Sequence, residues 1–245
     1  MPNPSELTVP LQTGAATTAL VYAAARDANR RIDAALILGH GAGAGQRSAF
    51  KVDFAHALSA LGLDVITFNF LYTEQGRRIP DRAPALEACY CSVIDRVYAE
   101  LPSARRALFI GGKSMGGRIA THVAAADPQL RLAGLVLIGY PLHPPGKPAE
   151  RRDKHLSAIA RPMLFIQGTR DAFGTPGEMA TVLGTLQPTP LVHVVAQGDH
   201  SFTLSRKDPT AQARIYADIQ CAIVDFIGQT SDVSLRTFSS ITSPP

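Results

Sequence analysis

The sequence predicts an α/β protein in which helices cover both faces of a mostly parallel sheet. Between residues 34 and 228, short apolar runs alternate with helix-like segments, a pattern typical of β-α-β units. The apolar runs are uninterrupted, as expected for strands buried on both faces. The length of 245 residues suits one domain. We therefore expect a single domain over residues 1–228 and a Ser/Thr-rich, disordered tail over residues 229–245.

The elements follow from the pattern along the chain. Two strand-like pieces, residues 7–11 and 17–22, are expected to open the sheet as antiparallel strands. The helix expected at 48–61 has an apolar face made of Phe50, Phe54, Ala57, Leu58 and Leu61. We expect further strands at residues 34–39, 63–70, 107–110, 132–140, 163–168 and 191–195, and further helices at 84–101, 118–126, 177–186 and 209–228.

Composition narrows the functional class. The net charge is +4, but the basic residues are scattered singles and pairs, so we expect no nucleic-acid partner. No apolar run reaches the roughly 18 residues of a membrane helix, and the first residues show no signal-peptide pattern. The three cysteines, Cys89, Cys91 and Cys221, are expected to be buried or half-buried free thiols. A cytoplasmic location without a metal or other cofactor fits these features.

A G-x-S-x-G motif lies at Gly112-Lys113-Ser114-Met115-Gly116. An apolar strand-like run precedes it and a helix-forming run follows it, and this strand–turn–helix context raises the motif above chance. Glycines flank the serine because a sharp turn brings strand and helix backbones together with no space for a Cβ atom. The pattern predicts that Ser114 is a nucleophile presented above the sheet edge.

Three other predicted strands are also followed by residues that could take part in catalysis. Residues 40–43 form a glycine-rich loop after the first buried strand, Asp171 follows the strand at 163–168, and His200 follows the last strand. In open α/β sheets the site forms at the carboxyl ends of the strands, so we expect these residues to meet Ser114. Their order in the chain is Ser, Asp, His, which is the order of the α/β-hydrolases.

The sequence resembles the α/β-hydrolase superfamily over residues 16–228, and the resemblance implies an α/β-hydrolase fold and a serine-hydrolase site. More narrowly, it is similar to the dienelactone-hydrolase-related, KANL/Tex-like hydrolases. The motifs that carry the likeness are His40-Gly41-Ala42-Gly43, Gly112-Lys113-Ser114-Met115-Gly116-Gly117, Gly168-Thr169-Arg170-Asp171-Ala172-Phe173-Gly174 and Gly198-Asp199-His200-Ser201-Phe202.

The chemistry assigns a role to each candidate residue. A serine hydroxyl needs an adjacent base near pH 7, and His200 would take its proton and return it to the leaving group. Asp171 would hold the imidazole in the correct tautomer and stabilise imidazolium. The backbone N–H groups of Met115 and of Ala42 would form the oxyanion hole.

Several neighbours carry two interpretations. Asp199 competes with Asp171 for the acid, but side chains of adjacent residues usually point apart, which favours Asp171. Lys113 could contact substrate or point outward. Arg118 and Arg170 could bind an anionic group or form structural salt bridges, and we favour the salt bridges. Phe173 and Phe202 could line a pocket or only pack.

The remaining histidines are expected to have no catalytic role. His40 is expected to shape its loop, and the others are expected to be ordinary surface or core residues: His56, His122, His143, His155 and His193.

The predicted function is hydrolysis of a carboxylic ester or thioester of a small molecule through an acyl-enzyme. Two alternatives remain: a non-catalytic binding module with a hydrolase-like fold, and a lactone hydrolase or peptidase on the same fold. The interval 141–160 is short and contains four prolines, so it predicts a rigid loop, a minimal cap and a shallow open site. Oligomeric state cannot be read from the sequence.

Overall fold

The computed structural model of the chain describes residues 3–25, 28, 31–204 and 208–241. Its strands are β1 (Ser5–Pro10), β2 (Ala16–Tyr22), β3 (Ala35–Gly39), β4 (Asp64–Phe68), β5 (Leu108–Lys113), β6 (Gly134–Ile138), β7 (Met163–Gly168) and β8 (Leu191–Val195). Its α-helices are α1 (Ala49–Ala60), α2 (Leu71–Glu74), α3 (Ala83–Glu100), α4 (Pro102–Arg106), α5 (Met115–Ala126), α6 (Pro176–Leu183) and α7 (Pro209–Ile241).

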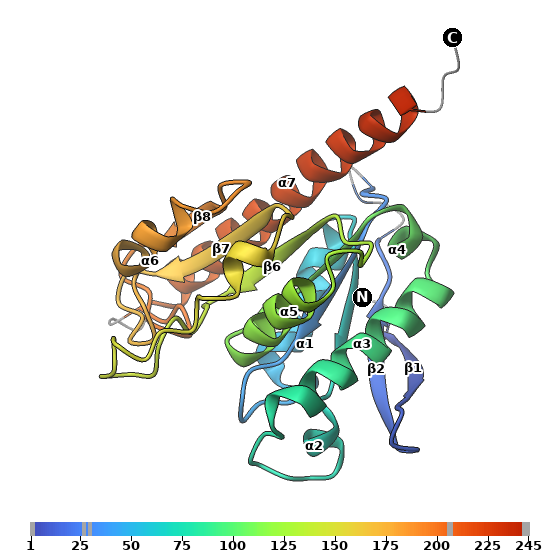
Figure 1. Ribbon diagram of the computed structural model, residues 1–245, viewed down its shortest axis with the longest axis horizontal. Coiled ribbons are helices and arrows are strands. Elements are labelled where there is room, and N and C mark those ends of the chain that lie inside the picture. The colour runs from blue at the N-terminus through green and yellow to red at the C-terminus, as the bar shows by residue number, and fades with distance from the viewer. Residues whose placement is uncertain (1–2, 26–27, 29–30, 205–207, 242–245) are drawn as a thin grey trace.

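The strands form one sheet in the order β1-β2-β4-β3-β5-β6-β7-β8 (Figure 1). β1 pairs antiparallel with β2, and β2 pairs antiparallel with β4. From β4 to β8 every pairing is parallel. The predicted architecture, a mostly parallel sheet opened by two antiparallel strands, is confirmed. All five residues of β3 and of β6 are buried, as their uninterrupted apolar runs predicted.

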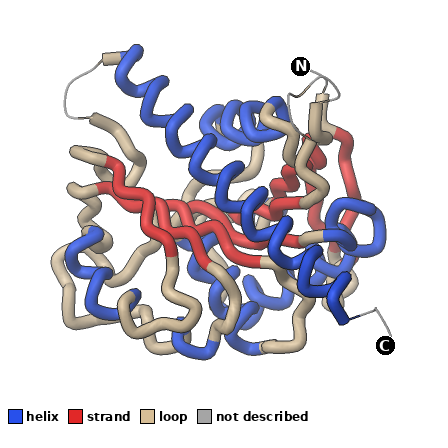
Figure 2. The backbone as a smooth tube through the Cα atoms, turned by 90° about the horizontal axis from the view of Figure 1, so that it is seen from above, coloured by secondary structure: helices blue, strands red, loops and turns tan. Residues whose placement is uncertain are grey.

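Helices cover the sheet on both faces, and each face has its own apolar core (Figure 2). α1 and α7 pack on one face, where Leu58 and Ile223 belong to the same core as Leu36 of β3. α3, α5 and α6 pack on the other face, with Tyr90 and Phe165 buried between helices and sheet. No helix within the described ranges is long and apolar enough to span a membrane.

The last helix differs from its predicted end. The sequence placed this end near Gly228 and treated residues 229–245 as a disordered tail, but α7 continues to Ile241 (Figure 1). A single glycine inside a helix costs only about 1 kcal/mol, and no proline interrupts the chain between Pro209 and Pro244. The helix can therefore pass Gly228, while residues 242–245 lie outside the described part of the chain. The short helices α2 and α4 were also not predicted.

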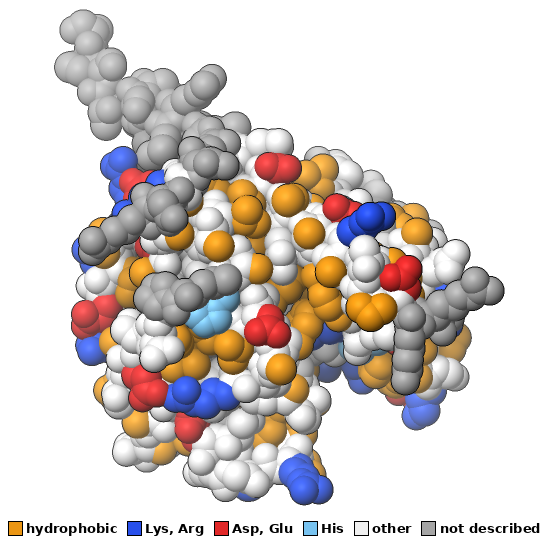
Figure 3. Space-filling view, turned by 180° about the vertical axis from the view of Figure 1, so that it is seen from behind, with side chains coloured by type: hydrophobic (Ala, Val, Ile, Leu, Met, Phe, Trp, Pro, Cys, Tyr) orange, Lys and Arg blue, Asp and Glu red, His pale blue; other side chains and the backbone are white. Residues whose placement is uncertain are grey.

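Residues 141–160, which were predicted to form a loop instead of a cap domain, do form a loop. Between β6 and β7 the structure contains only one turn of 3₁₀ helix, Leu156–Ala158. The carboxyl edge of the sheet is therefore not covered by a helical lid. On the face seen in Figure 3, Lys and Arg side chains lie singly or in small groups among acidic and apolar ones, as the scattered basic pairs in the sequence indicated.

A close backbone contact beside the predicted nucleophile joins the end of β3 to the turn before α5 and to the start of α5. A Cβ atom placed on Gly116 or on Gly112 would lie closer than 3.0 Å to the backbone oxygen of Gly39. The backbone of Gly112 also has φ +151°, a conformation that L side chains rarely adopt. The glycines around Ser114 are thus required by this contact, as the motif predicted.

Gly116→Ala is expected to lower the free energy of unfolding by about 2 kcal/mol or more, because the new methyl group meets the rigid backbone of β3. Gly177→Ala in α6 is the matched control, since its Cβ would meet nothing closer than the Thr175 Oγ1 atom at 3.9 Å. Urea unfolding of both variants tests the prediction. Equal stability of the two variants would contradict it.

Candidate active site

Ser114 occupies the turn between β5 and α5. Its φ of 52° and ψ of −115° place a non-glycine residue in a strained conformation, as expected for a sharp strand-to-helix turn. Its backbone N–H donates to the Ile138 oxygen at 2.9 Å, which ties the turn to β6. The strand–turn–helix context that the motif predicted is confirmed.

His200 and Asp171 lie beside Ser114, as the sequence predicted for residues at neighbouring strand ends. The Nε2 atom of His200 is 2.9 Å from the Ser114 Oγ atom. The Nδ1 atom of His200 is 2.8 Å from one carboxylate oxygen of Asp171 and 3.0 Å from the other. An ionised carboxylate only accepts hydrogen bonds, so Nδ1 carries the proton and Nε2 is free to accept from the serine hydroxyl.

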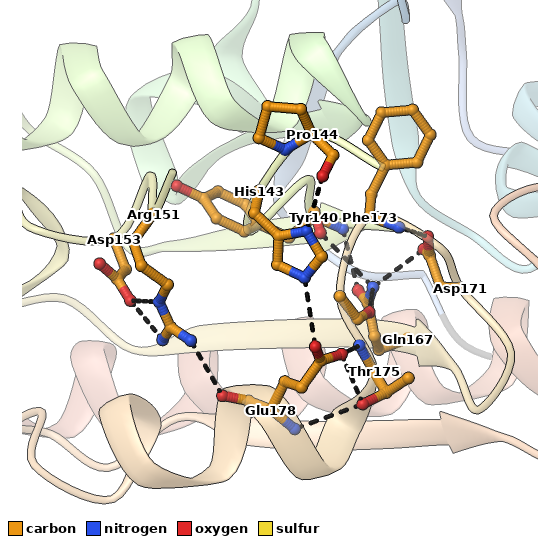
Figure 4. Close-up of polar contacts among 11 residues, drawn as sticks. Tyr140, His143, Pro144, Arg151, Asp153, Gln167, Asp171, Phe173, Thr175 and Glu178 are labelled. Carbon is orange, nitrogen blue, oxygen red and sulfur yellow. Dashed lines mark hydrogen bonds and ion pairs between the residues drawn. The ribbon is translucent and has the colours of Figure 1, made fainter. Parts of the chain in front are cut away.

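The carboxylate of Asp171 is held by a buried hydrogen-bond network (Figure 4). The Gln167 side chain donates to it at 2.9 Å, and the Phe173 backbone N–H donates at 2.8 Å. These donors fix the carboxylate while leaving it in contact with the histidine. The competing residue, Asp199, instead accepts from the Ser201 and Thr203 N–H groups and so shapes the loop that carries His200.

A cavity of about 590 Å³ opens at Ser114 and His200. Phe173 lines it, and its ring centroid lies 4.2 Å from that of His200. Phe173 therefore packs against the His200 ring and also lines the pocket, so both roles considered from the sequence apply to it. The other lining residues include Gly41, Ala42, Ala44, Ser48, Phe50, Lys51, Lys113, Met115, Arg118, Pro141, Arg152, Ser201 and Tyr216.

Both predicted oxyanion-hole residues, Ala42 and Met115, line this cavity. Met115 is the first residue of α5, where a backbone N–H has no partner within the helix. Ala42 lies in the glycine-rich loop after β3, and within the described chain its N–H likewise has no hydrogen-bond acceptor. Two unpaired N–H groups on the two sides of Ser114 can stabilise developing negative charge.

Three predicted substrate contacts have different outcomes. Lys113 lines the cavity, but its amine donates to the backbone oxygen of His200 and lies 5.0 Å from the ring centroid of Phe202. Phe202 is fully buried in the core and does not line the cavity, so its predicted contact with substrate is wrong. Arg170 is exposed, does not line the cavity and, among the described residues, forms none of the ion pairs that were favoured for it.

Lys51 is a site residue that the sequence analysis missed. Its side chain is buried, and its amine donates to the Gly39 oxygen at 2.7 Å beside the cavity. Burial, and to a smaller extent the charge of Lys113, lowers the pKa of Lys51 to about 7. Burial also lowers the pKa of Lys113, to about 8. The signal was present in the helical spacing, because Lys51, Phe54 and Leu58 share the buried face of α1.

His40 supports the loop that carries Ala42, as expected. Its Nδ1 atom lies 2.8 Å from the Gly41 oxygen, and its Nε2 atom accepts from the Phe70 N–H at 3.1 Å. Burial lowers the pKa of His40 to about 4, so the ring is neutral near pH 7. The five histidines expected to be ordinary surface or core residues, His56, His122, His143, His155 and His193, do not line the cavity.

The thiols of Cys89, Cys91 and Cys221 are free, as predicted. Cys89 is buried, and burial raises the pKa of its thiol to about 12. Cys91 and Cys221 are exposed, which corrects the expectation that all three would be buried or half-buried. None of the three cysteines lines the cavity.

Burying Lys51 makes the stability of the protein depend on pH. In the unfolded chain its amine has a pKa near 10.5, and in the folded protein about 7, so the unfolded state binds more protons between these values. The Lys51 contribution to the free energy of unfolding therefore rises with pH in that window. We expect Lys51→Met to stabilise the protein more at pH 6.5 than at pH 8.5, as measured by urea unfolding. The exposed residue Lys147, changed to Met, is the control and should show no such difference.

Comparisons with known proteins concern the fold and the family of the chain. A family described as "Alpha/beta hydrolase domain" matches residues 32–228. One similar solved structure is a lidless α/β serine hydrolase from Xanthomonas campestris, with 22% identity over 93% of this chain and 95% of that chain and a TM-score of 0.69. A second is a dienelactone hydrolase from Anabaena variabilis, with 19% identity over 89% of this chain and 96% of that chain and a TM-score of 0.65. A third is Est1E from Butyrivibrio proteoclasticus with bound ferulic acid, with 10% identity over 90% of this chain and 99% of that chain and a TM-score of 0.71. The protein therefore belongs to the alpha/beta hydrolase family.

Proposed function

We propose that the protein is a serine hydrolase that cleaves a carboxylic ester or thioester of a small molecule through an acyl-enzyme. The observation that carries this proposal is the continuous chain of contacts from Ser114 through His200 to the buried Asp171. A purely structural role would not require Ser114 and His200 to line a cavity with a buried Asp171 bonded to the histidine. We propose no cofactor for the reaction.

The proposed reaction has two half-reactions. The Ser114 hydroxyl attacks the acyl carbon while Nε2 of His200 takes its proton, and the Ala42 and Met115 N–H groups stabilise the oxyanion. The tetrahedral intermediate collapses, the C–O or C–S bond breaks, and His200 returns the proton to the leaving group. Water then adds to the acyl-enzyme by the same route, which releases the carboxylic acid and restores Ser114.

We also propose that the chain is related, within its family, to the dienelactone-hydrolase-related, KANL/Tex-like hydrolases. The four motifs quoted above and the likeness to a dienelactone hydrolase structure support this narrower placement. A lactone hydrolase remains the second candidate because a lactone is a cyclic ester that the same residues could open. An esterase is favoured because the site lacks a lid, so the cavity accepts open-chain esters from solvent.

Ser114→Ala is expected to abolish labelling by a fluorophosphonate probe and to reduce hydrolysis of p-nitrophenyl acetate by at least about 10³-fold, because the nucleophile is lost. Asp171→Asn should reduce hydrolysis by about 10⁴-fold, since the imidazole then adopts the wrong tautomer. The control is Ser157→Ala, which removes an exposed hydroxyl remote from the cavity. Wild-type protein that resists the probe and all such esters would favour the binding-module alternative.

Lys113→Met tests whether the buried amine positions the base. The change keeps the length of the side chain but removes the donor to the His200 backbone oxygen. We expect kcat to fall by about tenfold with little change in KM, since a lost charged hydrogen bond costs about 1.5 kcal/mol or more. A merely structural role predicts lower stability with an unchanged kcat at temperatures where the variant is folded. Lys147→Met is again the control.

A further inference from the structure

The cavity at Ser114 is lined by basic side chains and by no Asp or Glu among the described residues. Lys51 and Lys113 already have partners, because each amine donates to a backbone carbonyl. The two arginines, Arg118 and Arg152, differ: within the described chain, neither guanidinium forms an ion pair. The structural salt bridge favoured for Arg118 from the sequence is therefore not found.

Arg118 lies in the first turns of α5, four residues after Ser114. Its backbone N–H donates to the Ser114 oxygen, so the two residues are one helical turn apart on the same face. Its Nε atom is 3.4 Å from Nε2 of His122, a ring nitrogen that bears no negative charge. This contact orients the guanidinium without neutralising it, and Arg118 is one of the residues that line the cavity.

Arg152 reaches the same cavity from the loop between β6 and β7. Two hydrogen bonds hold its backbone: its N–H donates to the Leu142 oxygen at 2.8 Å, and its oxygen accepts from the Tyr140 hydroxyl at 2.7 Å. Burial and the nearby charge of Arg118 lower the pKa of the Arg152 guanidinium. Arg118 and Arg152 line the same cavity from two different elements, so two like charges face the same space.

The acidic residues around this pair are engaged elsewhere. Asp153 pairs with Arg151, the residue before Arg152, as Figure 4 shows. Glu150 pairs with Lys147. Glu87 pairs with His122. Bringing two guanidinium groups together without a carboxylate partner is unfavourable, and an anion from outside the chain would relieve the repulsion.

We propose that Arg118 and Arg152 form a subsite for a carboxylate group of the substrate, so that the preferred substrates are esters with an anionic group. This inference rests on the proposed hydrolase function and defines its substrate class. A guanidinium binds a carboxylate through parallel N–H···O bonds, and two of them can hold one carboxylate from two sides. Because Arg118 is one turn of helix from Ser114, on the order of 5 Å, the carboxylate is separated from the scissile carbonyl by a short chain of a few carbons.

Matched substrates test this proposal. We expect wild-type protein to hydrolyse 4-nitrophenyl hydrogen glutarate at least tenfold better in kcat/KM than its neutral methyl ester, because only the former presents a carboxylate. Arg118→Gln and Arg152→Gln should each reduce this ratio by about tenfold. Arg151→Gln is the matched control: it removes a neighbouring charge that pairs with Asp153 and does not line the cavity, so the ratio should persist. Equal rates for the two esters, or a ratio that survives both substitutions, would overturn the subsite.

A binding measurement separates this subsite from the catalytic proposal. In the Ser114→Ala background, calorimetry should detect glutarate binding that is lost on adding Arg118→Gln, while glutaramide should not bind. Arg118-dependent glutarate binding by a protein that never hydrolyses esters would refute the hydrolase but keep the subsite. Hydrolysis of neutral esters without glutarate binding would refute the subsite and keep the hydrolase. Binding of inorganic phosphate in place of glutarate would contradict the carboxylate assignment.

Discussion

The contact between the end of β3 and the turn that carries Ser114 is the constraint on which the site depends. The backbone oxygen of Gly39 lies where a Cβ atom of residue 112 or 116 would be, and it also accepts from the buried amine of Lys51. Because two strand ends and a helix start meet without intervening side chains, the turn is tight enough to hold Ser114 at φ 52°. A strained serine persists only where its surroundings determine it this firmly.

The same contact places the groups around the serine. Residues 40–43 leave β3 directly after Gly39, so Ala42 lines the cavity from this loop while Met115 lines it from the start of α5. A neutral His40 fastens this loop to Phe70 without adding charge. On the other side of Ser114, Lys113 connects the turn to the loop of His200. The proposed nucleophile, oxyanion donors and base are therefore coupled through backbone contacts and not only through side chains.

The sequence was most informative where function requires a fixed order of residues at strand ends. Ser114, Asp171 and His200 were all predicted in this way, and the sheet followed from its buried apolar runs. Phe202 was misassigned because proximity in sequence to His200 does not tell which way a side chain points, and here it points into the core. Lys51 was missed because a lone lysine in an amphipathic helix is normally solvated, although its spacing from Phe54 and Leu58 places it on the buried face of α1. The end of α7 was misplaced because one glycine is a weak helix terminator.

The groups of the cavity that can stabilise negative charge are of two kinds, which differ in when the charge they meet is present. In the proposed reaction, the N–H groups of Ala42 and Met115 would meet charge that develops only during attack, so they would lower the barrier itself. Arg118 and Arg152 would meet a charge that the substrate carries throughout, and such uniform binding acts on KM more than on kcat. Burial of Lys51 and Lys113 depresses their pKa values, which limits the positive charge that the chain must hold close to the arginines. The positive charge without a partner in the cavity is thereby concentrated on Arg118 and Arg152, the two guanidinium groups proposed to bind a carboxylate.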